Sequence, residues 1–227
     1  MSEPMSRVAN RVWDQAVLPQ ASLDLEALRA ARVEREPFAF FIVPRFVRAE
    51  ALGPIRADFP AIEHPGSFPL TALKFGPAFA AFIGELQSAR MTAAVGEKLG
   101  MDLMASPTMV TVRGQSRAAD GKIHTDSRTK LVTALIYMND SWESPRGRLR
   151  LVRSASDLND VIAEVPPEQG TLLVFRNDPQ AWHGFEPFAG PRRVIQLNWV
   201  TDASVVRREQ ARHRLSAFFK RLGKRGA

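Results

Sequence analysis

Apolar residues in the N-terminal part of the chain recur mostly at helical spacing. With Ser22 as the N-cap, this spacing predicts a helix over residues 24–36. Steps of three and four residues between apolar positions predict a second, longer helix over 77–99, which ends at Gly100. Between them, the short apolar run 38–43 predicts a strand.

From Met104 onward the pattern changes to short runs of Val, Ile, Leu and Thr, separated by turn residues. The runs predict strands over 108–113, 121–126, 130–138, 148–153, 161–165, 171–175, 181–186 and 192–201. Short strands at this close spacing favour an antiparallel sandwich or jelly roll. The expected fold is therefore α+β, a jelly roll with N-terminal supporting helices and a C-terminal basic helix.

The chain reads as one domain, 1–227, in three parts. Residues 1–103 are mainly helical support, 104–201 form the sheet core, and 202–227 form the terminal helix. The net charge is +7, but residues 1–202 hold 23 basic and 23 acidic side chains, whereas 203–227 hold eight basic side chains and one acidic. The body is neutral and the excess charge lies in the tail, which argues against a nucleic-acid partner for the body.

The tail combines basic residues with an apolar face, a pattern typical of a helix that lies on a membrane surface. That face consists of Leu215, Phe218, Phe219 and Leu222. Peripheral membrane contact through residues 205–225 is one interpretation, and packing on the protein's own helices is the other. Since no apolar run is long enough to span a bilayer, we expect a cytoplasmic protein, with peripheral membrane attachment left open.

The chain has no Cys and four His, so a metal site must use His and carboxylates. His124 and Asp126 are two residues apart on a predicted strand and point to the same side. His183 lies on a later strand that a jelly roll can place opposite them. Two imidazoles and one carboxylate with open positions suit Fe(II) oxygen chemistry, while hydrogen-bonded core histidines are the structural alternative.

Six segments together resemble a known family, the 2-oxoglutarate and Fe(II) dependent dioxygenases, and within it the prolyl hydroxylase-like branch. The segments are His124-Thr125-Asp126, 135–140, 147–151, 170–175, Trp182-His183-Gly184 and 190–195. The resemblance covers roughly residues 104–201, on which the double-stranded β-helix, or jelly roll, of that family fits. One departure is Arg146, which replaces the first of two glycines usual in the family, so a prolyl substrate does not follow from the resemblance.

The resemblance implies that His124, Asp126 and His183 bind Fe(II) and that a basic residue after the second His grips 2-oxoglutarate. Spacing to Trp199 favours Arg193 for that role, with neighbouring Arg192 on the opposite side of the strand as the alternative. The resemblance also implies that the single tyrosine of the chain, Tyr137, donates to the same cosubstrate carboxylate; its alternative role is that of a core aromatic residue.

The activity implied is hydroxylation of an unactivated C–H bond in a peptide, amino acid or other small substrate, with O2 consumed and succinate and CO2 released. Desaturation or cyclisation would use the same ligands. Arg113 and Arg128 are candidates for binding an acidic substrate, and the irregular segments 59–73 and 114–122 are candidate lids. The rival interpretation is a non-catalytic binding module with a structural metal site, tethered through the basic amphipathic C-terminal helix.

Overall fold

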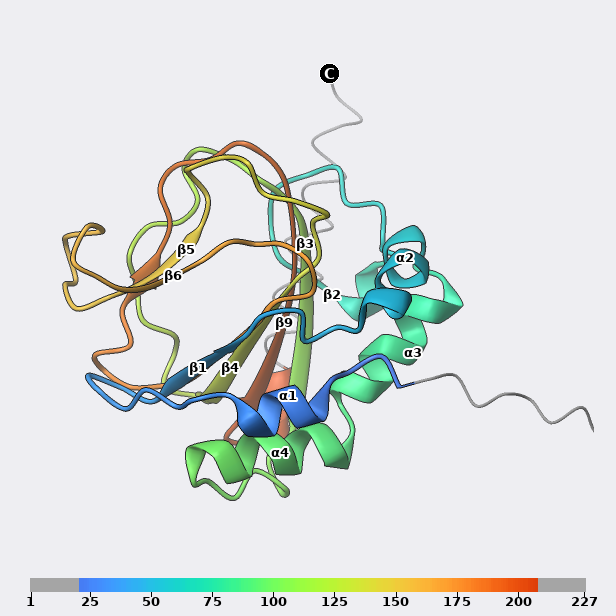
Figure 1. The fold of residues 1–227 in the computed structure, drawn as a ribbon, viewed down its shortest axis with the longest axis horizontal. Coiled ribbons are helices and arrows are strands. Elements are labelled where there is room, and N and C mark those ends of the chain that lie inside the picture. Colours follow the sequence, from blue (N-terminus) through green and yellow to red (C-terminus); the bar gives the residue numbers. More distant parts are fainter. Residues whose placement is uncertain (1–20, 208–227) are drawn as a thin grey trace, which may run out of the picture.

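The computed structural model describes residues 21–207 and contains two antiparallel sheets with helices on one side (Figure 1). The helices are α1 (Leu25–Ala30), α2 (Ala49–Ala57), α3 (Pro77–Leu86) and α4 (Ala89–Leu99), with a 3-10 turn at Leu70–Ala72. The strands are β1 (Phe40–Val43), β2 (Phe68–Pro69), β3 (Thr108–Ser116), β4 (Lys130–Tyr137), β5 (Leu149–Val152), β6 (Val161–Val165), β7 (Leu172–Arg176), β8 (His183–Gly184) and β9 (Gly190–Val200).

All strand pairs in these sheets are antiparallel. The larger sheet has the order β1-β7-β4-β9-β3-β2, and the smaller sheet has the order β6-β5-β8. The smaller sheet faces the side of the larger one that the helices leave free (Figure 1). This arrangement of helices and antiparallel sheets is consistent with a jelly roll, so the expected fold class is confirmed at that level.

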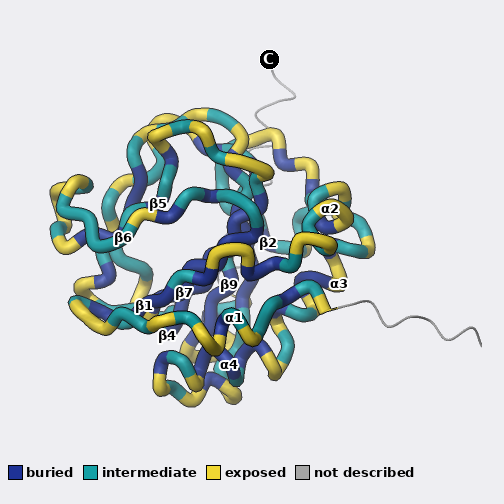
Figure 2. Tube along the Cα trace, in the orientation of Figure 1, coloured by how far each residue is buried: buried dark blue, intermediate teal, exposed yellow. Residues whose placement is uncertain are grey.

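Side-chain alternation along the central strands produces a separate hydrophobic core on each face of the larger sheet. On β7, Leu172 and Val174 pack with the helices, whereas Leu173 and Phe175 pack between the two sheets. Both faces are therefore covered, and Figure 2 shows the buried positions concentrated along these strands. The functional side chains described below project into the space between the sheets.

The single helix expected over 77–99 is two helices in the structure. Ser88 has an extended backbone, and its hydroxyl accepts a hydrogen bond from the Met91 amide, which starts α4 after the end of α3. Gly100 adopts a left-handed conformation and ends α4, as its position predicts. The break lets both helices keep their apolar faces against the sheet.

Other boundaries also differ from those expected from the pattern. Asp24, rather than Ser22, caps α1 by accepting a hydrogen bond from the Ala27 amide, and the helix ends at Ala30. Residues 121–126 form one isolated bridge instead of a strand, because the backbone there turns around Gly121. Helix α2 was not expected, since its apolar positions are few and Pro54 interrupts them.

The expected C-terminal helix begins at residue 203, but most of it, 208–227, lies outside the described residues. Membrane contact through 205–225 and a cytoplasmic location therefore stay predictions from the sequence. Within residues 21–207, no helix combines the length and apolar character needed to cross a membrane.

Replacing Phe82 tests how far the sheet depends on its helical cover. The Phe82 side chain is fully buried, so Phe82→Ala leaves a cavity and should lower the free energy of unfolding by about 3–5 kcal/mol. Phe75 is 37% exposed, and Phe75→Ala should cost less than about 2 kcal/mol. Chemical denaturation of both variants measures the difference, and equal losses would contradict the described packing.

Candidate functional site

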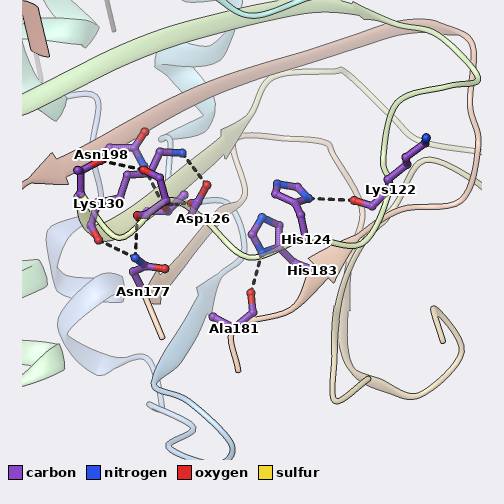
Figure 3. Close-up of polar contacts among 11 residues, drawn as sticks. Lys122, His124, Asp126, Lys130, Asn177, Ala181, His183 and Asn198 are labelled. Atoms are coloured by element: carbon purple, nitrogen blue, oxygen red, sulfur yellow. Dashed lines mark hydrogen bonds and ion pairs between the residues drawn. The ribbon is translucent and has the colours of Figure 1, made fainter. Parts of the chain in front are cut away.

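His124 and His183 meet through a backbone bridge between the segment after β3 and strand β8. The amide of each residue donates to the carbonyl of the other at 3.0 Å, and the two ring centroids are 4.3 Å apart. The Phe175 ring packs against the His183 ring, with 4.8 Å between the two ring centroids. Two residues that are distant in the sequence are thus held side by side by the backbone itself (Figure 3).

Each imidazole has its Nδ1 atom occupied by a backbone carbonyl. In His124 the partner is the Lys122 oxygen, and in His183 it is the Ala181 oxygen, both at 2.9 Å (Figure 3). A carbonyl only accepts, so Nδ1 carries the proton and Nε2 keeps a free lone pair. Burial, reinforced by the charge of His124, lowers the pKa of His183 to about 4. The His183 imidazole is therefore neutral at pH 7, the state that binds a metal.

The Asp126 carboxylate is held by two side chains of β4. Lys130 Nζ lies 2.6 Å from Oδ1, and the Thr133 hydroxyl donates to Oδ2. The Thr133 hydroxyl in turn accepts a hydrogen bond from the buried amide of Asn198 at 2.7 Å. Burial opposes ionisation of Asp126, but Lys130 and His183 outweigh it, and its pKa is lowered. The carboxylate is ionised and fixed in orientation.

Ligand atoms of His124, Asp126 and His183 all lie within 4.8 Å of one another. Two imidazoles and one carboxylate in this arrangement can surround a single divalent ion and leave coordination positions open to small ligands. The donor set therefore fits Fe(II). The three residues chosen from the sequence come together in the structure.

A cavity of about 410 Å³ between the sheets begins at these three residues and extends to Arg192. Arg192 is only 5% exposed; its Nε donates to the Gly147 carbonyl at 2.8 Å, and its Cζ lies 4.2 Å from the centroid of the Phe185 ring. Among the described residues, neither Arg192 Nη2 nor the nearby Tyr137 hydroxyl has a hydrogen-bond partner. Burial raises the pKa of Tyr137 to about 12, with Arg192 offsetting part of the shift, so the hydroxyl remains a donor.

Unpaired buried donors are costly, and two of them side by side indicate a missing acceptor. A carboxylate bound at Arg192 would accept from both groups, because a guanidinium and a phenol are donors that match its two oxygens. These donors therefore fit the far carboxylate of 2-oxoglutarate, whose other end would lie at the metal ligands.

Arg192 faces the cavity and Arg193 does not, the reverse of the orientation expected from the sequence. The Arg193 amide donates to Asn139 Oδ1 at 3.0 Å, and its guanidinium lies over Phe59, 5.6 Å from the ring centroid. Arg193 does share a face with Trp199, as period two requires, but that face packs against the helices. The expectation treated the Trp199 face as the interior of the jelly roll.

The two arginines suggested for the substrate are separated by the structure. Arg113 lines the cavity beside the metal ligands, whereas Arg128 lies outside it, in a different hollow together with Arg176. Sequence reasoning did not single out Thr133 and Asn198, which orient Asp126. A local signal was available, since each is a polar residue between two apolar neighbours of a strand: Thr133 follows Val132, and Asn198 follows Leu197.

Comparisons with known proteins agree with this site. A family model described as the 2OG-Fe(II) oxygenase superfamily matches residues 114–201. No curated protein sequence matches the chain.

Similar solved structures show the fold. A prolyl-4-hydroxylase from Pseudomonas putida has a TM-score of 0.55 at 18% identity, with 79% of this chain and 100% of that chain covered. A prolyl 4-hydroxylase from Phytophthora capsici has a TM-score of 0.52 at 18% identity, with 82% of this chain and 68% of that chain covered. A prolyl hydroxylase from Trichoplax adhaerens, in complex with a peptide fragment of hypoxia inducible factor, has a TM-score of 0.52 at 19% identity. The match covers 76% of this chain and 86% of that chain.

The matched segment contains all three candidate metal ligands, together with Arg192, which lines the cavity, and the buried Tyr137. Over residues 114–201, which include the His-Asp-His group, the chain is therefore similar to the 2OG-Fe(II) oxygenase superfamily, and its fold is that of the prolyl hydroxylase structures.

Proposed function

We propose that this oxygenase hydroxylates a C–H bond of a small organic substrate, with one O2 and one 2-oxoglutarate converted to succinate, CO2 and the hydroxylated product. The observation that carries the proposal is a single cavity with two functional ends. His124, Asp126 and His183 can hold a metal at one end, and Arg192, with its unpaired Nη2 and the buried Tyr137 ring beside it, lies at the other.

When bound, Fe(II) supplies the O2 chemistry that protein side chains lack. The chain's own residues bind and orient. Carbonyls 122 and 181 engage Nδ1 of both imidazoles, so Nε2 would be the atom that binds the ion, and Thr133 and Lys130 hold the Asp126 carboxylate in orientation. Such preorganisation keeps the reacting groups at a constant separation, which is the main contribution of the protein in this kind of chemistry.

Arg192 and Tyr137 set the position of 2-oxoglutarate. Arg192 is anchored by Gly147 and stacked on Phe185, so its Nη2 is rigid. The charged guanidinium supplies most of the attraction, and the neutral Tyr137 hydroxyl adds a directed hydrogen bond. We infer that Arg192, not Arg193, is the cosubstrate clamp.

Metal and cosubstrate binding test the proposal directly. Anaerobic addition of Fe(II) and 2-oxoglutarate should produce a visible metal-to-ketoacid charge-transfer band, and O2 should then yield succinate. His183→Ala and Asp126→Ala each remove a ligand and should reduce both signals by more than about 100-fold. His64→Ala, a histidine outside the metal group, should leave them unchanged. Absence of both signals in the wild type would favour the binding-module interpretation.

The cosubstrate clamp can be tested with two adjacent arginines as variant and control. Arg192→Gln should raise the Kd for 2-oxoglutarate by about 10- to 100-fold, because a hydrogen bond between charged groups is lost. Arg193→Gln should change it less than about threefold, since Arg193 lies on the other face of β9. Titration of the charge-transfer band measures both values, and the opposite ranking would return the clamp to Arg193.

The close approach of the two His segments depends on glycine at position 184. A Cβ atom there would lie 2.7 Å from the Gly121 carbonyl oxygen and 3.2 Å from Ile123 Cα. Gly184→Ala should therefore separate the imidazoles and weaken Co(II) or Fe(II) binding by at least about tenfold. Gly53→Ala, where a Cβ atom meets nothing within 4 Å, is the matched control and should not alter metal affinity.

A further inference from the structure

Arg113 stands at the junction of two cavities beside the metal ligands. The first is the cavity that contains Arg192, and the second, of about 270 Å³, lies on the other side of Asp126. The residues that line both are Arg113, His124, Asp126, Lys130 and Gln196. Arg192 lines the first cavity and not the second. A ligand in the second cavity would therefore contact Arg113 and the metal without displacing a cosubstrate bound at Arg192.

Arg113 has no direct ion-pair partner among the described residues, although the charges of Asp120 and Asp126 attract it. No hydrogen bond or ion pair joins its guanidinium to another residue in the part of the chain that the structure describes, 21–207. The nearby carboxylates have other partners, since Asp120 pairs with Arg117 at 3.1 Å and Asp126 with Lys130 at 2.6 Å. Arg192 also faces the same cavity and repels Arg113. A half-buried guanidinium in this position favours an anion.

Charge balance leads to the same conclusion for the loaded site. The negative charges of 2-oxoglutarate and Asp126 together balance those of Fe(II) and Arg192. Of the other Lys, Arg, Asp and Glu residues that line the two cavities, Arg113, Lys122 and Lys130 are positive, whereas Asp120, which pairs with Arg117, is negative. Because interactions between charges are strong in a partly buried site, a neutral substrate would leave this surplus uncompensated.

The second cavity is lined mainly by hydroxyl and amide side chains. They come from separate segments and include Ser67, Thr111, Thr125 and Asn198. Such a lining can make several hydrogen bonds to a polar ligand.

We propose that Arg113 binds an anionic group of the substrate, a carboxylate or a phosphate, and that this oxygenase acts on a small polar anion. The inference rests on the proposed function and names the substrate class for the same site. Arg113 holds the anion in the second cavity, and the rest of the substrate extends past Asp126 toward the metal.

Small anions and their uncharged counterparts test this directly. Acetate with acetamide, and methyl phosphate with methanol, are titrated onto the anaerobic Fe(II) and 2-oxoglutarate form, with calorimetry and the charge-transfer band as readouts. At least one anion should bind saturably and its neutral counterpart should not; which anion binds separates the two kinds of substrate. Arg113→Gln should weaken that binding by about 10- to 100-fold, and Arg113→Lys, which keeps the charge, by less.

Arg128→Gln is the matched control and should not alter anion binding, because Arg128 lies outside both cavities. Saturable binding of neither anion to the wild type, or equal binding by Arg113→Gln, would overturn the inference. It would also be overturned if Arg113→Gln weakened 2-oxoglutarate binding as strongly as Arg192→Gln, since Arg113 would then serve the cosubstrate. Loss of the charge-transfer band in the wild type would instead refute the proposed function and this inference with it.

Discussion

The metal centre depends on one pair of backbone hydrogen bonds, those between His124 and His183. They bring two distant segments into contact at the ligand residues themselves, so the backbone already places the two imidazoles side by side. The two segments are so close that a Cβ atom at position 184 would collide with the carbonyl oxygen of Gly121. Two further carbonyls orient the rings. Backbone geometry thus sets both the spacing and the tautomers of the histidine ligands.

The larger sheet makes this centre possible because its two faces pack against different partners, the helices on one side and the smaller sheet on the other. Helices α1, α3 and α4 cover one face with apolar contacts, which stabilise the sheet without using its other side. The second face is then free to combine a smaller apolar core with polar positions such as Thr133, Arg192 and Asn198. Polar groups in that space are tolerated where they bind one another or where a ligand completes them.

Charge within the cavity has a different origin from the net charge of the chain. The surplus of +7 lies in the terminal segment, while residues 1–202 are balanced. The cavity is nevertheless basic, because its lining sets four basic side chains, those of Arg113, Lys122, Lys130 and Arg192, against two acidic ones, those of Asp120 and Asp126. Local arrangement, rather than composition, determines which ligands the site attracts.

The sequence by itself determined the candidate ligand residues and the alternation of the central strands, but not the backbone at 121–126, which forms a single bridge where a strand was expected. The ligand types, the two-residue spacing of His124 and Asp126, and the alternation within β4, β7 and β9 are local properties, and the structure retains them. Only the tertiary structure decided which of Arg192 and Arg193 faces the cavity. Alternation shows that they point apart, but β9 is buried on both faces by different partners, so hydrophobicity alone does not identify the inner one.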